Sequence, residues 1–139
     1  MLNLAKKKII IQATGKRKKA IARAIARAGN GKIFINNKSL EVFEPEMLRL
    51  MIKEPLLLAE NVGKDLDINV NVRGGGIFGQ ASATRQAIAK ALVKYDKTLK
   101  EKFLNYDKTL LVADFRRTEV HKPSRSRKGA RRHKQRSKR

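Results

Sequence analysis

The stretch LDINVNVRGGGIFGQA, residues 66–81, decides the fold, because it joins a strand signal to the start of a helix. Its first half alternates polar residues with four apolar ones, Leu66, Ile68, Val70 and Val72. Alternation with a period of two is typical of a strand that buries one face. Glycines then end the strand, and we expect a helix to begin near Ser82.

The residues after Ser82 follow the spacing of an amphipathic helix. Its apolar face repeats at i, i+3, i+4 and i+7, at Ile88, Ala91, Leu92 and Tyr95. The opposite face carries lysines, at Lys90, Lys94 and Lys97. The pentapeptide YDKTL occurs twice nearby, at residues 95–99 and 106–110. We interpret the two copies as the starts of two similar local structures and not as a structural repeat. In each copy the aspartate caps the turn that follows it.

Three strands are expected upstream, although one of them is ambiguous. The β-branched run at residues 9–14 predicts a strand that ends at the basic turn of residues 16–19. Residues 20–27, AIARAIAR, suit a helix by their alanine content. As a strand they would place all four alanines on one face and the longer side chains on the other. A turn at residues 29–31 and a further strand at residues 32–36 favour the strand, as the upstream arm of a hairpin.

A helix is expected to begin at residues 44–46, Glu-Pro-Glu. Proline at the first helical position loses no hydrogen bond, and the acids complement the helix dipole. Pro55 should break or kink this helix, which we expect to stop near Gly63. The sequence therefore predicts an α+β fold, with a body of sheet and helices over residues 1–115 and an extended tail over residues 116–139.

The net charge of +22 is concentrated at the two ends of the 139-residue chain. Residues 1–38 hold 11 basic and no acidic residues, residues 39–115 hold 11 of each, and residues 116–139 hold 12 basic residues and one acidic residue. Such a charge opposes compaction unless a counter-charge is present, and nucleic acid is the usual counter-charge. The distribution indicates a compact RNA-binding or DNA-binding body with cationic extensions.

Other partners and sites are disfavoured by the composition. The chain has no run of about 18 apolar residues and no signal-peptide pattern, so we expect a soluble intracellular protein with no membrane partner. It has no cysteine, and its two histidines lie in basic sequence, so no metal site is expected. No serine or threonine has a histidine placed as its base, so we expect no catalytic residues and no enzyme activity.

The glycines at residues 74, 76 and 79 match the dinucleotide-binding pattern in a formal sense. The rest of that unit is missing, because no strand follows the helix, so no nucleotide cofactor is expected. Two interpretations stay open. The glycines can make a tight turn, or their exposed amides at a helix N-terminus, with Arg73 and Arg85 nearby, can hold RNA phosphates.

Several blocks of the sequence resemble one known family. The blocks are GKRKKAIAR at 15–23, EP at 44–45, EPL at 54–56, NVRGGGIFGQA at 71–81, LLVADFRRTE at 110–119 and SKR at 137–139. In this order they resemble the universal family of small-subunit ribosomal protein nine, and EPL and RRTE are similar to its archaeal and eukaryotic branch. The resemblance covers nearly the whole chain after about Ile10.

The resemblance implies a fold similar to the second domain of ribosomal protein five. That fold is a mixed sheet with helices on one face and a left-handed βαβ crossover. It also implies a place in the head of the small subunit of the cytoplasmic ribosome, bound to small-subunit rRNA beside neighbouring head proteins. The tail would thread through the rRNA and reach the anticodon stem-loop of the P-site tRNA.

Two sets of contact residues are expected. The resemblance places the tRNA contact at the end of the chain, on Ser137, Lys138 and Arg139. It places the family's basic turn on the first four of the expected rRNA contacts. These contacts are Lys16, Arg17, Lys18, Lys19, Arg23, Arg73, Gly74, Gly75, Gly76, Arg85, Arg116, Arg117, Lys122, Arg125, Arg127, Lys128, Arg131, Arg132, Lys134 and Arg136. The tail departs from the family in one respect, because residues 123–129 hold one glycine where family tails are often glycine-rich.

The composition of the tail favours contact with the phosphate backbone. Residues 116–139 hold eight arginines and four lysines and no aromatic residue, which argues against recognition by base stacking. We expect the tail to be disordered when free and to order on assembly. A DNA-compacting protein would share the charge, but it usually exposes a groove-reading helix or a wedge residue, and neither is identified in this sequence.

Overall fold

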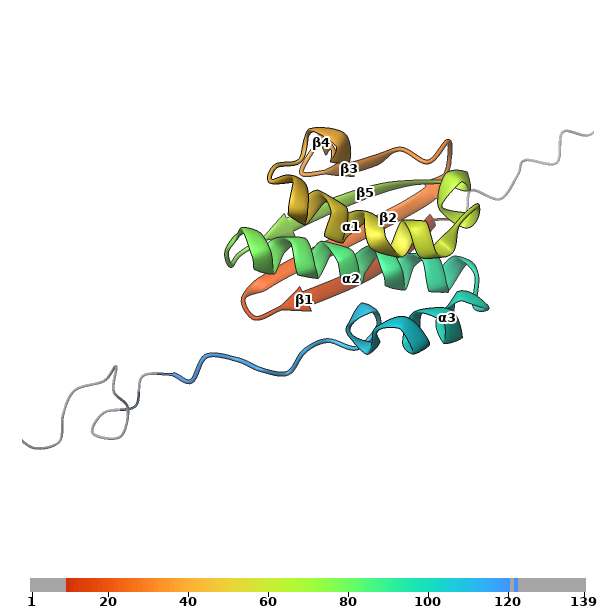
Figure 1. Cartoon of the computed structure of the whole chain (residues 1–139). Helices are drawn as coiled ribbons and strands as arrows, with labels where there is room; N and C mark the ends of the chain where they lie inside the picture. The colour runs from red at the N-terminus through yellow and green to blue at the C-terminus, as the bar shows by residue number, and fades with distance from the viewer. Residues whose placement is uncertain (1–9, 121, 123–139) are drawn as a thin grey trace, which may run out of the picture.

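The computed structural model describes residues 10–120 and residue 122 (Figure 1). It contains a mixed five-stranded sheet in the order β1-β2-β5-β3-β4. The strands are β1 (Ile10–Arg17), β2 (Ala20–Ala28), β3 (Ile33–Ile35), β4 (Lys38–Ser39) and β5 (Leu66–Arg73). The helices are α1 (Glu46–Ala59), α2 (Ile77–Tyr95) and α3 (Leu99–Tyr106), with short 3₁₀ turns at Leu40–Val42, Val62–Asp65 and Lys108–Leu110.

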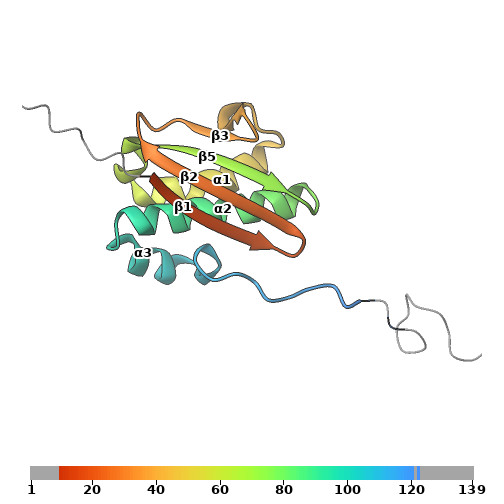
Figure 2. The ribbon, with the colours of Figure 1, turned by 180° about the vertical axis from the view of Figure 1, so that it is seen from behind.

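The helices α1 and α2 cover one face of the sheet and leave the other face open (Figures 1 and 2). The strands β2 and β5 alternate strictly between buried and outward-facing positions along most of their length, as a half-covered sheet requires. Helix α3 contacts α1 and α2, and its Phe103 is fully buried. The expected α+β class is confirmed.

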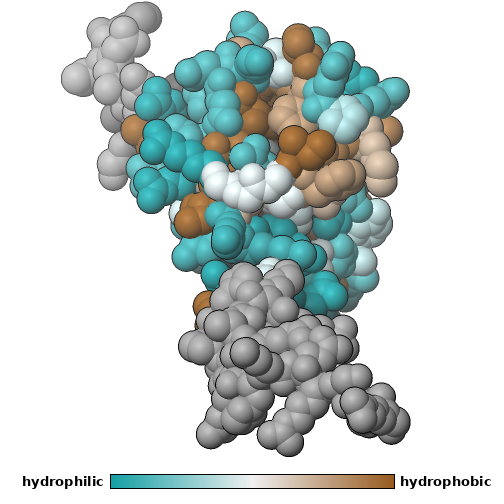
Figure 3. Space-filling view, turned by 90° about the vertical axis from the view of Figure 1, so that its left-hand side faces the viewer, coloured by the Kyte–Doolittle hydropathy of each residue, from teal (hydrophilic) through white to brown (hydrophobic). Residues whose placement is uncertain are grey.

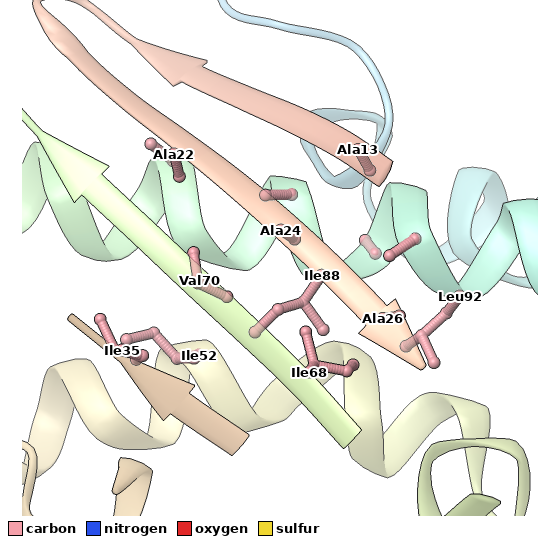
Figure 4. Close-up of a cluster of buried hydrophobic side chains, with 14 of the residues drawn as sticks. Ala13, Ala22, Ala24, Ala26, Ile35, Ile52, Ile68, Val70, Ile88 and Leu92 are labelled. Carbon is pink, nitrogen blue, oxygen red and sulfur yellow. The ribbon is translucent and has the colours of Figure 1, made fainter. Parts of the chain in front are cut away.

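Strand β2 confirms the strand interpretation of its alanine-rich sequence. Four alanines point into the core and are almost completely buried, at Ala20, Ala22, Ala24 and Ala26. Figure 4 shows three of them beside Ile88 and Leu92 of α2 and Ile68 and Val70 of β5. Alanines also dominate the buried face of α2, so small side chains meet on both surfaces. We infer that this pairing lets α2 lie close to the sheet.

The expected hairpin between the second and third strands is wrong. Strand β2 pairs antiparallel with β5, and β5 pairs parallel with β3, so β5 lies between them. The chain crosses the start of β5 at residues 29–32, where the Asp67 carboxylate accepts hydrogen bonds from the N–H groups of Asn30 (2.8 Å) and Lys32 (2.9 Å). These bonds lower the pKa of Asp67 below its ordinary value. The two hydrogen bonds hold the connection between β2 and β3 where it crosses β5, so the two strands are joined by a crossing segment and not by a hairpin turn.

The parallel pair β3 and β5 is joined through α1, and this crossover has an unusual hand. In Figure 1 both strands run from right to left, β5 lies below β3, and α1 lies in front of the sheet. The crossover is therefore left-handed, whereas nearly all such connections are right-handed. This is the hand that the family resemblance implies.

Two helix boundaries differ from expectation. Helix α1 runs through Pro55 without a break, and the proline is itself fully buried in the core. The helix ends at Ala59, before the expected stop near Gly63, which lies in a separate 3₁₀ turn. Helix α2 begins at Ile77, five residues before Ser82, with the extended Gly76 as its N-cap. The apolar periodicity did not predict this first turn, because its Ile77 and Phe78 are exposed. The prediction that the aspartate of each YDKTL copy caps the following turn is confirmed. Asp96 and Asp107 each accept a hydrogen bond from the N–H two residues later.

The outer edge of β1 is covered by side chains of α2. The Nζ atoms of Lys90 and Lys94 donate to the carbonyl oxygens of Thr14 (3.2 Å) and Gln12 (2.6 Å). The N–H of Lys16 donates to Oε1 of Gln86 at 2.8 Å. Burial, followed by the nearby charges of Lys16 and Lys94, lowers the pKa of Lys90. The free edge of the sheet is thus bonded to the helix that covers it.

Substituting Gly15→Ala is expected to destabilise the protein by about 1–3 kcal/mol, through overpacking between β1 and α2. A Cβ atom at this position would lie 2.0 Å from the Ala83 carbonyl oxygen and 2.7 Å from the Ala87 nitrogen, both backbone atoms. Urea unfolding measures the loss. The matched control is Gly76→Ala, where a Cβ would meet nothing within 4 Å. An equal cost in both variants would contradict the close approach of strand and helix.

Candidate nucleic-acid interface

Three segments that are far apart in the sequence meet at one end of the molecule, which we call the hairpin end. They are the basic turn of residues 16–19, the glycine loop of residues 73–76, and residues 114–117, where the tail begins. In Figure 1 the β1–β2 turn, the start of α2 and the departing tail all lie on the left. The Asp114 carboxylate forms ion pairs with Arg17 and Arg116, which joins the tail to the turn.

The basic turn presents its lysines to solvent. Lys16, Lys18 and Lys19 are exposed, and within residues 10–120 and 122 none of the three has an ion-pair partner. Lys18 adopts a positive φ of 52°, which closes the turn between the strands. Adjacent cations repel one another, so this turn favours an anionic ligand.

The glycine loop has a structural reason for two of its glycines. Gly74 and Gly75 adopt positive φ values of 78° and 66°, and a Cβ at Gly74 would lie 2.5 Å from the Lys19 carbonyl oxygen. The tight-turn interpretation therefore holds for these two residues. Gly76, by contrast, has open space around it. It is the N-cap of α2 and has no side chain to accept a hydrogen bond, so first-turn N–H groups of α2 lie uncapped beside the basic turn.

The geometry does not match a dinucleotide-binding unit. Helix α2 leads into α3, and within the described part of the chain no strand follows α2. The unit needs a second parallel strand at that point to complete the fold around a dinucleotide. No cofactor-binding residues are therefore assigned to the glycine loop.

Arg85 occupies a mostly internal position, at the wall of a hollow that the basic turn also lines. It is 8% exposed, and its Nε lies 2.6 Å from Oε2 of Glu54. Its Nη2 lies 2.9 Å from Oδ2 of Asp107, and its Nη1 donates to Oγ1 of Thr109 at 3.2 Å. Two carboxylates already neutralise this guanidinium, so an rRNA contact at Arg85 stays a prediction that its ion pairs disfavour. Its partners lie 31 and 22 positions away, so local sequence could not reveal them.

The same ion-pair cluster shifts the pKa values of Asp107 and Tyr106. Burial opposes ionisation of Asp107, but hydrogen bonds from Thr109 and Arg85 outweigh it, so the pKa of Asp107 is below its ordinary value. A hydrogen bond to Glu54, followed by the charge of Glu54, raises the pKa of Tyr106. Both shifts belong to a cluster that joins α1, α2 and the segment after α3, so its role is structural.

Asp114 joins the start of the tail to the basic turn, and the sequence analysis did not single it out. Its side chain is 11% exposed, and its Oδ2 lies 2.6 Å from Nη2 of Arg116. Because it also pairs with Arg17, it fixes the point from which the tail leaves the body. A hollow of ≈ 370 Å³ lies here, and its lining includes Lys16, Arg17, Lys18 and Arg116.

Two further expected residues lie on the open face of the sheet. Arg23 and Arg73 are exposed, and together with Lys19 they line a shallow hollow of ≈ 730 Å³. Its floor contains Ile21, Phe34 and the amide side chains of neighbouring strands. The cations of the hairpin end therefore continue onto the open face.

Figure 3 shows the hairpin end with hydrophilic side chains over most of the visible body and apolar side chains gathered at the upper right. Arg117 is exposed, and Lys122 pairs with Glu119 at 2.8 Å. The remaining expected contacts lie outside the described residues. They are Arg125, Arg127, Lys128, Arg131, Arg132, Lys134, Arg136, Ser137, Lys138 and Arg139.

Two classes of site find no support in residues 10–120 and 122. No three His, Asp or Glu side chains gather there in a way that could hold a metal ion. None of the helices in this part of the chain has the length and apolar character needed to span a bilayer.

Known proteins share this sequence along nearly its whole length. A family model described as Ribosomal protein S9/S16 matches residues 15–139. The small ribosomal subunit protein uS9 of Methanococcus maripaludis strain C5 is 51% identical over 130 residues, which cover 92% of this chain and 97% of the relative. The protein of the same name from Methanococcus vannielii is 48% identical over 130 residues, with the same coverage. The chain therefore belongs to the ribosomal protein S9/S16 family.

Proposed function

We propose that this chain is a structural constituent of the small ribosomal subunit, in the head of the cytoplasmic ribosome, where it binds small-subunit rRNA. One observation carries the proposal: cations from separate segments converge at the hairpin end, while residues 39–115 have no net charge. Membership of the family and the uS9 relatives support the assignment. We further propose that the fold resembles the second domain of ribosomal protein five.

The proposed contact is electrostatic and directed at phosphates. The lysines of the basic turn, Arg73, and the first-turn N–H groups of α2 present donors and positive charge together. Arg23 and Arg73 extend this surface onto the open sheet face. Gly74 and Gly75 serve it indirectly, because they allow the loop to pack against Lys19 and Ala20.

The tail is proposed to continue the rRNA contact and to end at the anticodon stem-loop of the P-site tRNA. Asp114 holds its first residues at the hairpin end, so the tail starts where the other cations lie. From Arg116 to Arg139 an extended chain spans at most roughly 80 Å. If eight of its cations each neutralise one phosphate, the logarithm of the affinity falls with the logarithm of the salt concentration at a slope of about −6 to −7.

The assignment is tested by sedimentation of a lysate in moderate salt. The chain should migrate with small subunits and leave them only as the salt concentration rises. A free pool bound to chromosomal DNA would instead identify an architectural DNA-binding protein, and would refute the proposed function.

Deleting the last three residues, Ser137, Lys138 and Arg139, is expected to leave assembly intact and to weaken P-site tRNA retention. Losing two cations removes two contacts at most, which corresponds to on the order of tenfold in tRNA affinity near 0.1 M salt. Filter binding of tRNA to purified small subunits measures this effect. Normal affinity in the truncated subunits would refute the proposed role of the tail end.

A further inference from the structure

Helix α1 has an outer apolar face that the fold does not use. Its core side is formed by Leu48, Ile52, Pro55 and Ala59, all of which are buried. On the outer side Met47 is 72% exposed, Leu50 is 56% exposed and Leu57 is 73% exposed. We call these three residues the outer face of α1. A helix that is apolar on two sides is typical of one packed between two layers, and here one layer is present.

The outer face borders a hollow that could receive a side chain. Its volume is ≈ 450 Å³, and its lining includes all three outer-face residues together with Met51 and Tyr106. Met51 also lines the neighbouring hollow beside Phe78, whose side chain is 61% exposed. The apolar surface therefore extends from α1 toward the first turn of α2. Large exposed apolar patches of this kind mark interaction sites more often than plain solvent contact.

The charge around this face is opposite in sign to that of the whole chain. Residues 41–60 hold five glutamates and two cations, in a protein with a net charge of +22. One of the cations is engaged, because Arg49 pairs with Glu46 and donates to the Glu41 carbonyl oxygen at 2.7 Å. A polyanion would be repelled by this surface.

We propose that the outer face of α1 docks an amphipathic segment of another small-subunit protein. The segment presents apolar side chains to Met47, Leu50 and Leu57, and lysines or arginines to the glutamates at the margin. This inference rests on the proposed function, because it needs the chain to be part of the small subunit. The docking surface and the candidate RNA interface meet at one hollow, which Met51 and Phe78 line together with the basic turn.

The contact is tested by photo-cross-linking in purified small subunits that contain the full chain. Leu57 is replaced by benzoylphenylalanine, with Lys100 of α3, which is also exposed, as the control position. We expect a cross-link at Leu57 to one small-subunit protein, at least fivefold above the control. Mass spectrometry should place it in a segment with apolar residues flanked by lysine or arginine. A cross-link to rRNA, a cross-link to a second copy of this chain, or no yield above the control overturns the proposal.

A double substitution, Met47→Ser with Leu57→Ser, provides a second measurement. Two lost apolar anchors should reduce the amount of that partner retained in salt-washed subunits by about tenfold or more. Because both side chains are more than two-thirds exposed, the thermal midpoint of the free protein should change little. Unchanged partner retention overturns the proposal, and so does an equal loss in Lys100→Ser.

The two proposals can fail separately. If rRNA binding by the free, full-length protein keeps its affinity and salt slope in the double variant, the RNA surface is intact and a lost partner reports on docking alone. If the unsubstituted protein shows no salt-dependent rRNA binding, the proposed function fails whatever the cross-link shows.

Discussion

Replacing Lys16, Lys18 and Lys19 by glutamate is expected to lower the affinity of the full-length protein for small-subunit rRNA by on the order of 10²-fold near 0.1 M salt. These lysines are exposed and have no ion-pair partner among the described residues, so their charge is available to phosphates. The salt slope should become less steep by about 2–3, since each contact with a phosphate contributes close to one unit. Titration of labelled rRNA at several salt concentrations measures both quantities.

The matched control reverses three lysines at the opposite end of the molecule. Lys64, Lys97 and Lys100 are exposed, and their replacement by glutamate changes the net charge by the same amount. We expect this variant to keep most of its affinity and nearly its full salt slope. Equal losses in the two triple variants would mean that net charge alone drives binding, and that the hairpin end is a solvated surface.

Substituting Arg85→Met is expected to destabilise the protein by about 2–4 kcal/mol, less than for a fully buried pair because both carboxylates are partly exposed. The methionine leaves Glu54 and Asp107, at 25% and 33% side-chain exposure, without their shared cation. Urea unfolding measures the loss. Arg49→Met removes an exposed pair with Glu46 and should cost less than about 1 kcal/mol. Equal costs would contradict the internal role of Arg85.

The same variant has a predictable pH dependence. The folded pKa of Asp107 is below its ordinary value, so its contribution to stability is present above that ordinary value and is lost as the pH falls through the folded one. Arg85 is one cause of the lowering, so the stability gap between the two proteins should narrow as the pH falls below about 4. A gap that stays constant from pH 6 to pH 3 would show that the two side chains are not coupled.

The Arg85→Met variant also distinguishes an rRNA contact from a structural ion pair, which the sequence alone could not distinguish. If Arg85 contacted rRNA, Arg85→Met would lower the affinity of protein that is still folded. Because its guanidinium is held by Glu54 and Asp107, we expect the rRNA affinity of the folded variant to remain unchanged.

Local patterns predicted the elements of this fold better than their arrangement. The alternation in β5 identified that strand, because the pattern is contained in a few consecutive residues. The alanine-rich sequence of β2 suited either a helix or a strand, and the strand was favoured by an expected hairpin that does not form. The pairing of the strands depends on contacts between distant positions, such as the hydrogen bonds from residues 30 and 32 to Asp67. No local signal marks these contacts, and a turn followed by a strand therefore suggested a hairpin.

The candidate interface was predictable to a similar extent. The cations of residues 16–19 form a visible cluster in the sequence, and they lie exposed as expected or, for Arg17, paired with Asp114. The closeness of the glycine loop to that cluster depends on the packing of Gly74 against Lys19, which no spacing rule reveals. In the sequence, Arg85 cannot be told apart from the exposed cations, because its partners Glu54 and Asp107 lie far from it along the chain.

The side chains of α2 that bond to β1 also affect how copies of the free protein can associate. An uncovered strand edge offers a row of N–H and C=O groups on which another chain can add a strand. Gln86, Lys90 and Lys94 occupy several of these groups on one edge, and β4 at the other edge is two residues long. The described sheet therefore offers little template for strand pairing between copies of the free protein.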